Sequence, residues 1–363
     1  MCKAAMDEAP DVKAVVAPLE DHDAFLAEWT QLYASCPDAG FFQSPEWMTA
    51  WLAGAPEGAE LYRVEVSENG APKLMGAFAA PKRKTMGLGL REVWFQEFGD
   101  PARDAIYPEY LDFLAPRPSG GLRTKAAGAI MNYFTDADGF VFRNARMRMT
   151  STVLSAAAGR GFSARVLREQ PVYVCELGST DFIAGLSKSL QTKIRRSIAL
   201  YEERGGIKTR LAQTAEEKKA AFEKLKELHQ QRWRARGREG VFANPHLKSF
   251  HERLRAHAPE NLHLFEVSAG GETFAVLYNF VHGKRVMNYQ SGFNIEDDNR
   301  VSPGFVAHAL AAQFYQDKGF EAYDLLAGEE EYKARLGDPE TILTSFVVER
   351  PTWRNRLRAR VKG

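Results

Sequence analysis

Residues 322–338, with the sequence AYDLLAGEEEYKARLGD, bring together the side chains of this chain that best suit acid–base chemistry. Asp324 lies in a short apolar strand pattern, where a carboxylate must either reach solvent at the strand end or be paired. A tight turn then brings Glu330, Tyr332 and Lys333 close to that strand end. A carboxylate can accept a proton, and an ammonium group can stabilise a developing negative charge. The alternative is a solvated surface helix in which Lys333 pairs with a neighbouring glutamate.

A second candidate site is the start of the helix expected from Ser302 to residue 318. Ser302 suits the N-cap, Pro303 suits the first turn, and Gly304 leaves the backbone N–H groups open to a ligand. Because a helix N-terminus favours negative charge, a pyrophosphate or a thioester carbonyl could bind there. Arg300, just before this helix, is grouped with these three residues as a cofactor-binding candidate. A helix start that is merely capped is the alternative.

Three further residues are candidates for substrate binding. Tyr289 and Gln290 lie in the strand pattern that precedes this loop, and His308 lies in the helix that follows it. A packing role is the alternative for His308, because its neighbours on the helix are apolar. No serine, histidine and acid combination with the spacing of a hydrolase triad is present. The three cysteines, one of which is Cys2, stand far apart, which argues against a zinc site or a disulfide framework.

An internal duplication predicts the elements that position these residues. Residues 61–78 align without gaps onto residues 262–279, and each segment has the pattern of a strand, a glycine-containing turn and a second strand. Residues 93–100 resemble residues 286–294 as a third strand, and a helix and a further strand follow in both places. We therefore expect an α/β (α+β) fold of two similar units, each with a mixed, mostly antiparallel sheet flanked by helices.

The duplication also predicts where the chain divides. We expect a first unit over residues 1–170, a second unit over residues 171–349 and a basic tail over residues 350–363. The second unit has LLAGEEEYK where the first has FRNARMRMT. We therefore assign catalysis to the second unit and the shaping of the substrate site to the first.

The tail, RPTWRNRLRARVKG, contains five arginines and one lysine but no acidic residue. Its apolar residues Trp353, Leu357 and Val361 recur every four positions. As a helix, the tail would present an apolar stripe flanked by positive charge, which is typical of a segment that lies on an anionic membrane surface. The alternative is a disordered basic tail.

The composition limits the remaining classes of function. The 363 residues are 45% hydrophobic and 26% charged, which suits a globular protein with more than one core. The formal net charge of +1 does not favour nucleic-acid binding. Because no run of 18 apolar residues occurs, we expect a cytoplasmic protein that at most rests on the inner membrane.

Several motifs, in matching order over roughly residues 40–345, resemble one family. The chain is similar to the BioF2-like and CelD-like acyltransferases of the GNAT superfamily, which are related to the FemAB peptidyltransferases of cell-wall synthesis. The motifs are FFQSPEW, LSKSLQTKIRR, LHQQRWRARG, YQSGFN, SPG and YDLLAGEEEYKARLG. This resemblance implies two tandem GNAT-like units and the transfer of an acyl group from acyl-CoA to an amine, without a metal.

The resemblance also implies roles for the candidate residues. The helix start from Ser302 to Gly304 would meet the pyrophosphate of the carrier, and Tyr332 with Lys333 matches an aromatic–lysine pair that serves acyl transfer in FemAB-like enzymes. Glu330 or Asp324 would then accept the proton of the amine. Lys333 would stabilise the oxyanion or the carrier phosphates, with Tyr332 and Tyr289 shaping the pocket.

The acceptor amine is expected from the same group of enzymes. Bacterial ceramide synthases belong to it, and the basic tail suits a lipid substrate, so a long-chain amino alcohol is the first expectation. Transfer to an amino sugar or peptide in cell-wall or exopolysaccharide synthesis is the alternative. A non-enzymatic pair of GNAT-like units acting as a scaffold is the third possibility, and it predicts no thioester binding.

Overall fold

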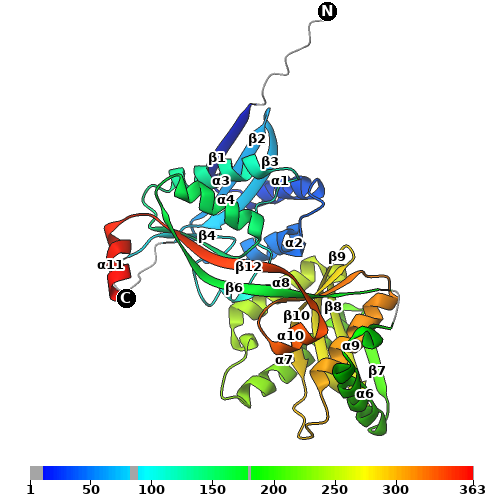
Figure 1. Cartoon of the computed structure of the whole chain (residues 1–363). Helices are drawn as coiled ribbons and strands as arrows, with labels where there is room; N and C mark the ends of the chain where they lie inside the picture. The colour runs from blue at the N-terminus through cyan, green and yellow to red at the C-terminus, as the bar shows by residue number, and fades with distance from the viewer. Residues whose placement is uncertain (1–10, 82–88, 179–180, 363) are drawn as a thin grey trace, which may run out of the picture. The chain divides into compact units, whose positions relative to one another are not determined.

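The computed structural model describes residues 11–81, 89–178 and 181–362, so Cys2 lies outside the described residues. The chain forms two compact units, which we describe separately. The first unit comprises residues 1–169 and 344–363, and the second comprises residues 170–343. Figure 1 labels the elements of both units.

The first unit contains one sheet and the helices that cover it. Its strand order is β1-β2-β3-β4-β5-β12. The elements in chain order are β1 (Val12–Pro18), α1 (His22–Ala34), α2 (Pro45–Leu52), β2 (Leu61–Glu68), β3 (Ala71–Ala79), β4 (Glu92–Phe95), α3 (Gly120–Tyr133), β5 (Gly139–Ala145), α4 (Met147–Ala158) and α11 (Trp353–Lys362), with parts of β6 (Ser163–Glu176) and β12 (Asp338–Glu349).

The second unit repeats this arrangement with the strand order β7-β8-β9-β10-β11-β6. Its elements are α5 (Phe182–Gly185), α6 (Lys188–Glu203), β7 (Ile207–Leu211), α7 (Ala215–Arg234), α8 (Pro245–His257), β8 (Leu262–Ala269), β9 (Glu272–His282), β10 (Arg285–Phe293), α9 (Pro303–Asp317), β11 (Ala322–Ala327) and α10 (Glu331–Leu336).

The two sheets confirm the predicted duplication. In each, a hairpin is followed by an antiparallel third strand, which then pairs in parallel with the strand after the helix. The register shifts in the two hairpins, at Val66/Ser67 and at Val267/Ser268, fall at aligned positions. The hairpin turns also match, because Gly70 and Gly271 both have positive φ, at 78° and 89°. Tight hairpin turns favour glycine in this conformation.

The sixth strand in each strand order does not follow the fifth strand in the chain. Residues 344–349 of β12 pair with β5 in the first unit, whereas residues 172–176 of β6 pair with β11 in the second. The sequence assigned residues 344–349 to the second unit, and the structure corrects this placement. The pairing of β12 with β5 is long-range, so local sequence patterns did not predict it.

The C-terminal segment also differs from the predicted separate tail. Residues 353–362 form helix α11, which belongs to the first unit. Asn355 and Arg358 of this helix are buried. The reason is that Arg358 pairs with Glu92 and Glu349, and the Asn355 amide donates to backbone carbonyls.

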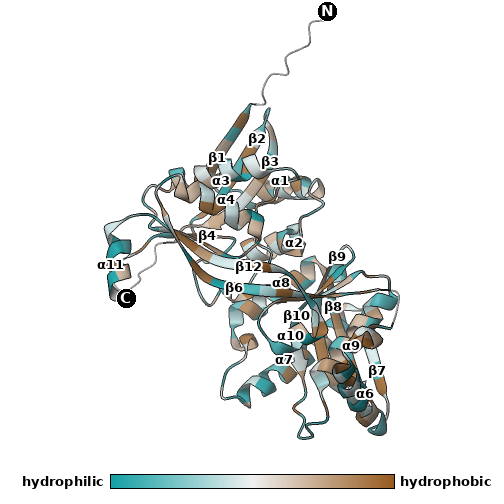
Figure 2. Cartoon of the chain, viewed as in Figure 1, coloured by the Kyte–Doolittle hydropathy of each residue, from teal (hydrophilic) through white to brown (hydrophobic). Residues whose placement is uncertain are grey.

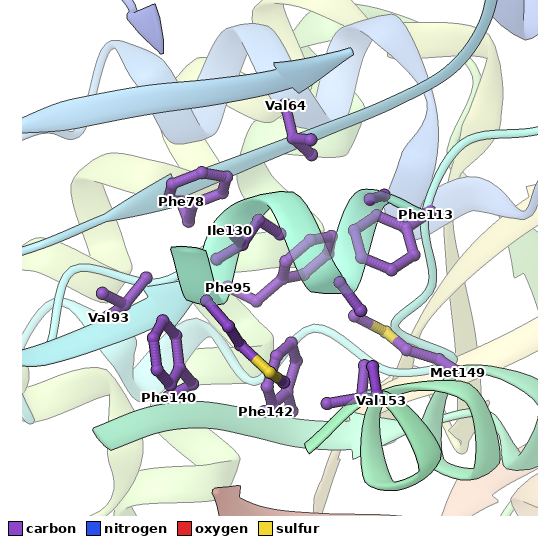
Figure 3. Packing of buried hydrophobic residues seen from close by; sticks show 14 of the residues in the cluster. Val64, Phe78, Val93, Phe95, Phe113, Ile130, Phe140, Phe142, Met149 and Val153 are labelled. Atoms are coloured by element: carbon purple, nitrogen blue, oxygen red, sulfur yellow. The ribbon is translucent and has the colours of Figure 1, made fainter. Parts of the chain in front are cut away.

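Each unit has its own apolar core. Figure 3 shows the core of the first unit, in which Phe78 and Phe95 come from the sheet, Ile130 from α3 and Met149 from α4. The core of the second unit lies under α6 and α9 and includes Ile194, Leu277 and Tyr315. Figure 2 shows that strands of both units are rich in hydrophobic residues.

The opposite face of the second sheet carries α7 and α8. Tyr278 and Phe280 point to this face, where they surround His251 of α8 together with Phe222 of α7. Asn279, between them on β9, points to the other face and donates to the Tyr315 hydroxyl of α9 at 3.2 Å. The alternation along β9 therefore separates two side-chain environments within this unit.

His251 gives a prediction about acid stability. Burial lowers its pKa to about 3, and its Nε2 has no hydrogen-bond partner. An unfolded histidine titrates near 6.5, so below that pH the unfolded state binds more protons and stability falls. The unfolding free energy of the parent should fall between pH 7 and pH 5. In His251→Phe this fall should be smaller by about 2 kcal/mol. Urea titrations at both pH values measure this difference.

The exposed His257 of the same helix provides the matched control. His257→Phe should leave the pH dependence of the parent unchanged. Parallel pH profiles for the parent and His251→Phe would contradict the assignment of this acid sensitivity to His251.

Two general observations concern the described residues alone. None of their helices combines the length and the apolar character needed to cross a bilayer. No group of three or more His, Cys, Asp or Glu side chains among them is placed to hold a metal ion.

Candidate active site

The candidate site lies where β10 and β11 of the second unit cease to pair. The two parallel strands are in register only over Arg285–Met287 and Ala322–Asp324. Beyond this point β11 shifts register against β6, with Leu326 at φ 60°, and β10 has a bulge between Asn288 and Gln290. Helices α9 and α10 follow these two strand ends in the chain. Bulges of this kind redirect side chains and are frequent beside active sites.

Lys333 of α10 is held against the irregular end of β11. Its side chain is only 8% exposed. The ammonium group donates to the carbonyls of Ala327 at 2.7 Å and Leu326 at 3.3 Å, and Glu330 Oε2 lies 3.5 Å away. Gly328 leaves room for this group, because a Cβ at that position would lie 2.6 Å from Lys333 Nζ and would displace it. The buried ammonium group is thus fixed by neutral carbonyls and one long ion pair.

Glu330 and Asp324 have very different surroundings. The Glu330 side chain is 61% exposed. Glu330 is the N-cap residue of α10, although its side chain makes no capping bond. Asp324 is fully buried, at 2.9 Å from the Arg285 guanidinium, and its Oδ1 accepts the backbone N–H of Leu326 at 2.8 Å. Asp324 therefore holds the bulge whose carbonyls bind Lys333.

His308 of α9 lies beside the catalytic candidates of α10. Its ring stacks on Tyr332 with centroids 5.3 Å apart, and its Nδ1 lies 2.9 Å from the Tyr323 hydroxyl. Burial, with the nearby charges of Lys333 and Arg232, lowers the pKa of His308 to about 3. Burial also raises the pKa of the Tyr332 phenol above its usual value. Both rings are therefore neutral at pH 7.

The start of α9 has unpaired backbone donors. Ser302 occupies the N-cap position, but its side chain makes no capping bond, and its N–H donates to Ser197 Oγ at 2.9 Å. Within the described residues, the N–H groups of Gly304 and Phe305 have no acceptor. Such a helix start attracts anions through its N–H groups and its dipole.

Two cations flank this helix start. Lys193 Nζ of α6 lies 4.8 Å from the centroid of the Phe305 ring, and the Arg335 guanidinium of α10 lies 5.1 Å from it. Arg300, a predicted cofactor-binding residue, forms a bidentate pair with Asp298 through its guanidinium. The structure thus offers Lys193 and Arg335 as cations at the start of α9.

Helix α10 lies along the first turns of α9. Arg335 of α10 lies near Phe305 of α9. Tyr332, three residues before Arg335, stacks on His308, three residues after Phe305. A spacing of three residues is about one helical turn. A ligand with an anionic group at the start of α9 could therefore extend along this helix pair toward Lys333.

Tyr289 and Gln290 lie on β10. The Tyr289 ring stacks on Phe280 with centroids 4.6 Å apart and lies 5.2 Å from His251. Its ring therefore belongs to the α7 and α8 face, whereas His308 belongs to the α9 face. Gln290 is half-buried and opposes Tyr278 in the ladder.

Three cationic residues near the site were missed by sequence reasoning. They are Lys193, Arg335 and Arg232 of α7, whose guanidinium lies 5.5 Å from the centroid of the Phe293 ring. Burial lowers the pKa of Arg232 below its usual value, and no carboxylate within the described residues pairs with it. One sequence signal could have identified Lys193. It stands one helical turn before Ser197, beside the apolar stripe of α6.

Comparison with known proteins identifies a domain within the second unit. Residues 188–334 match the family model described as an acetyltransferase (GNAT) domain. The matched segment contains the helix start at Ser302 and the residue Lys333. No curated protein matches the chain.

Solved structures match the whole chain in fold. FemX has a TM-score of 0.55 at 11% identity, over 93% of this chain and 98% of that one. The C-terminal domain of a lysylphosphatidylglycerol synthetase from Agrobacterium fabrum has a TM-score of 0.53 at 10% identity, over 94% and 95%. A tandem GNAT protein from the clavulanic acid biosynthesis pathway has a TM-score of 0.52 at 14% identity, over 94% and 100%. These likenesses confirm the predicted fold of two tandem GNAT-like units.

Proposed function

We propose that this chain, an acyltransferase with a GNAT acetyltransferase domain over residues 188–334, transfers an acyl group from acyl-CoA to a primary amine. The observation that carries the donor is the start of α9. There, the N–H groups of Gly304 and Phe305 have no acceptor among the described residues, and the cations Lys193 and Arg335 both contact the Phe305 ring. This arrangement suits the pyrophosphate of CoA, because charge-assisted hydrogen bonds to phosphate are strong.

The reaction centre that we propose is Lys333 with Glu330. The amine nitrogen attacks the thioester carbonyl carbon, which forms the C–N bond and an oxyanion. Collapse of this intermediate breaks the C–S bond, and the sulfur leaves as CoA thiol with the proton that the attacking nitrogen loses. Lys333 stabilises the oxyanion, because its contact with Glu330 is long and can be exchanged for one with the substrate oxygen.

Glu330 is the proton acceptor that the surroundings favour. Its exposed carboxylate can take the ammonium proton directly or through a water molecule and pass it to solvent. Asp324 is already bound to Arg285 and to the Leu326 N–H, so it serves to position the β11 bulge. Tyr332 and the neutral His308 form an apolar wall beside the thioester.

Two acceptor classes are supported by different observations. The first is a long-chain amino alcohol, which gives a ceramide-type amide, and the exposed Trp353 and Leu357 of α11 support a lipid substrate. The second is an amino sugar or peptide of envelope synthesis that carries an anionic group. Arg232 supports this class, because its guanidinium lies 5.5 Å from the centroid of the Phe293 ring and no carboxylate among the described residues pairs with it.

The decisive experiment pairs acetyl- and palmitoyl-CoA with sphinganine-type bases and with amino sugars that carry or lack a phosphate. Thiol release and mass spectrometry of the product are measured together. We expect CoA thiol and an amide in equal amounts with one acceptor class. Thiol release that no amine accelerates, or a failure of CoA to bind in calorimetry, would contradict the proposal.

A further inference from the structure

The exposed face of α11 combines apolar and cationic side chains. Trp353 is 63% exposed and Leu357 is 40% exposed, one turn apart, and Arg356 and Arg360 are exposed on the same side. At about 100° per residue, these four positions fall within roughly 100° of arc. Trp353 and Leu357 are large exposed apolar side chains of a helix in which Figure 2 shows many hydrophilic residues.

The opposite face fixes the helix to the first unit. Arg358 donates to Glu92 at 3.2 Å and also pairs with Glu349, and the Asn355 amide donates to the Asp138 carbonyl at 2.6 Å. Thr352 Oγ1 accepts the Asn355 N–H and donates to the Asp138 carboxylate. These bonds determine which side of α11 faces outward.

The charges on the two faces have different partners. The acids that contact α11, Asp138, Glu92 and Glu349, are buried or half-buried and pair with Arg354 and Arg358. Arg356 and Arg360 have no acidic partner within the described residues. Their positive charges therefore remain available beside the exposed Trp353 and Leu357.

We propose that this face of α11 binds the surface of a bilayer that contains anionic lipids. Tryptophan prefers the interface between headgroups and hydrocarbon, and arginine pairs with lipid phosphate. The rigid attachment to the first unit lowers the cost of binding, because the helix is already formed. This inference does not depend on the acyl transfer reaction, and its test needs no substrate.

The test is flotation of the full chain with phosphatidylcholine vesicles that contain or lack 30% phosphatidylglycerol. We expect binding to the anionic vesicles alone, with weaker binding as salt is raised. Arg356→Gln with Arg360→Gln should weaken the binding at least about tenfold, as should Trp353→Ala with Leu357→Ala. Brominated phosphatidylglycerol should quench tryptophan fluorescence in the parent but much less in Trp353→Phe.

A matched control removes two exposed charges elsewhere. Arg195 and Arg196 of α6 are both exposed, so Arg195→Gln with Arg196→Gln changes the net charge equally and should retain binding. An equal loss in this control, no binding by the parent, or unchanged binding in the α11 variants would each overturn the proposal. So would a parent dimer that Trp353→Ala with Leu357→Ala converts to a monomer, since the face would then be a contact between copies.

Discussion

Lys333→Met is expected to lower kcat by about 10²- to 10³-fold while leaving the KM for acyl-CoA within about threefold of the parent. The reason is that the ammonium group lies beside the irregular end of β11, where it can stabilise charge that develops only in the transition state. Steady-state thiol release with saturating amine measures both constants.

The control for this variant is Lys318→Met at the C-terminal end of α9. Lys318 is exposed and lies 5.8 Å from the Phe314 ring, so its removal should leave kcat unchanged. Because Lys333 also satisfies two carbonyls, the melting temperature of each variant should be measured, and only folded variants compared. A turnover of Lys333→Met within about threefold of the parent would exclude the proposed role.

Lys193→Met combined with Arg335→Met is expected to raise the KM for acyl-CoA by about 150-fold or more, with a much smaller change in kcat. Each cation is proposed to make a charge-assisted contact with the pyrophosphate, and removal of one such contact costs about 1.5 kcal/mol or more. The helix N–H groups would remain, so binding should be weakened and not abolished.

Two comparisons make this prediction specific. An acyl-pantetheine thioester lacks the pyrophosphate, so its KM should be the same for the double variant and the parent. Arg300→Gln is the matched cation control, because the Arg300 guanidinium already pairs with Asp298, and its effect should be within about twofold. An equal rise in KM for both thioesters would contradict the prediction, because it would show that the two cations contact a part of the substrate other than the pyrophosphate.

The duplicated fold was predictable because its signals are local. Alternating apolar residues and a glycine turn specify each hairpin, and Gly70 and Gly271 adopt the positive φ that such turns need. The helix start at Ser302 was also predictable, since Ser-Pro-Gly has a local conformational meaning. These features depend on residues close together in the chain.

The surroundings of the site were less predictable because they depend on distant residues. Lys193 and Arg335 come together only when α6 and α10 pack near the start of α9. Helix α6 also carries the exposed cations Arg195 and Arg196, and local patterns do not distinguish them from Lys193, which is the one beside Phe305. The pairing of Asp324 with Arg285 likewise joins residues 39 positions apart.

The placement of residues 344–349 has a consequence for synthesis of the chain. These residues follow the second unit in the chain, yet they pair with β5 of the first unit. All residues of the second unit are translated before them. The C-terminal unit can therefore complete its sheet first, while the N-terminal unit waits with β5 as an open edge. The unit that is translated first is thus the one whose last strand is translated later.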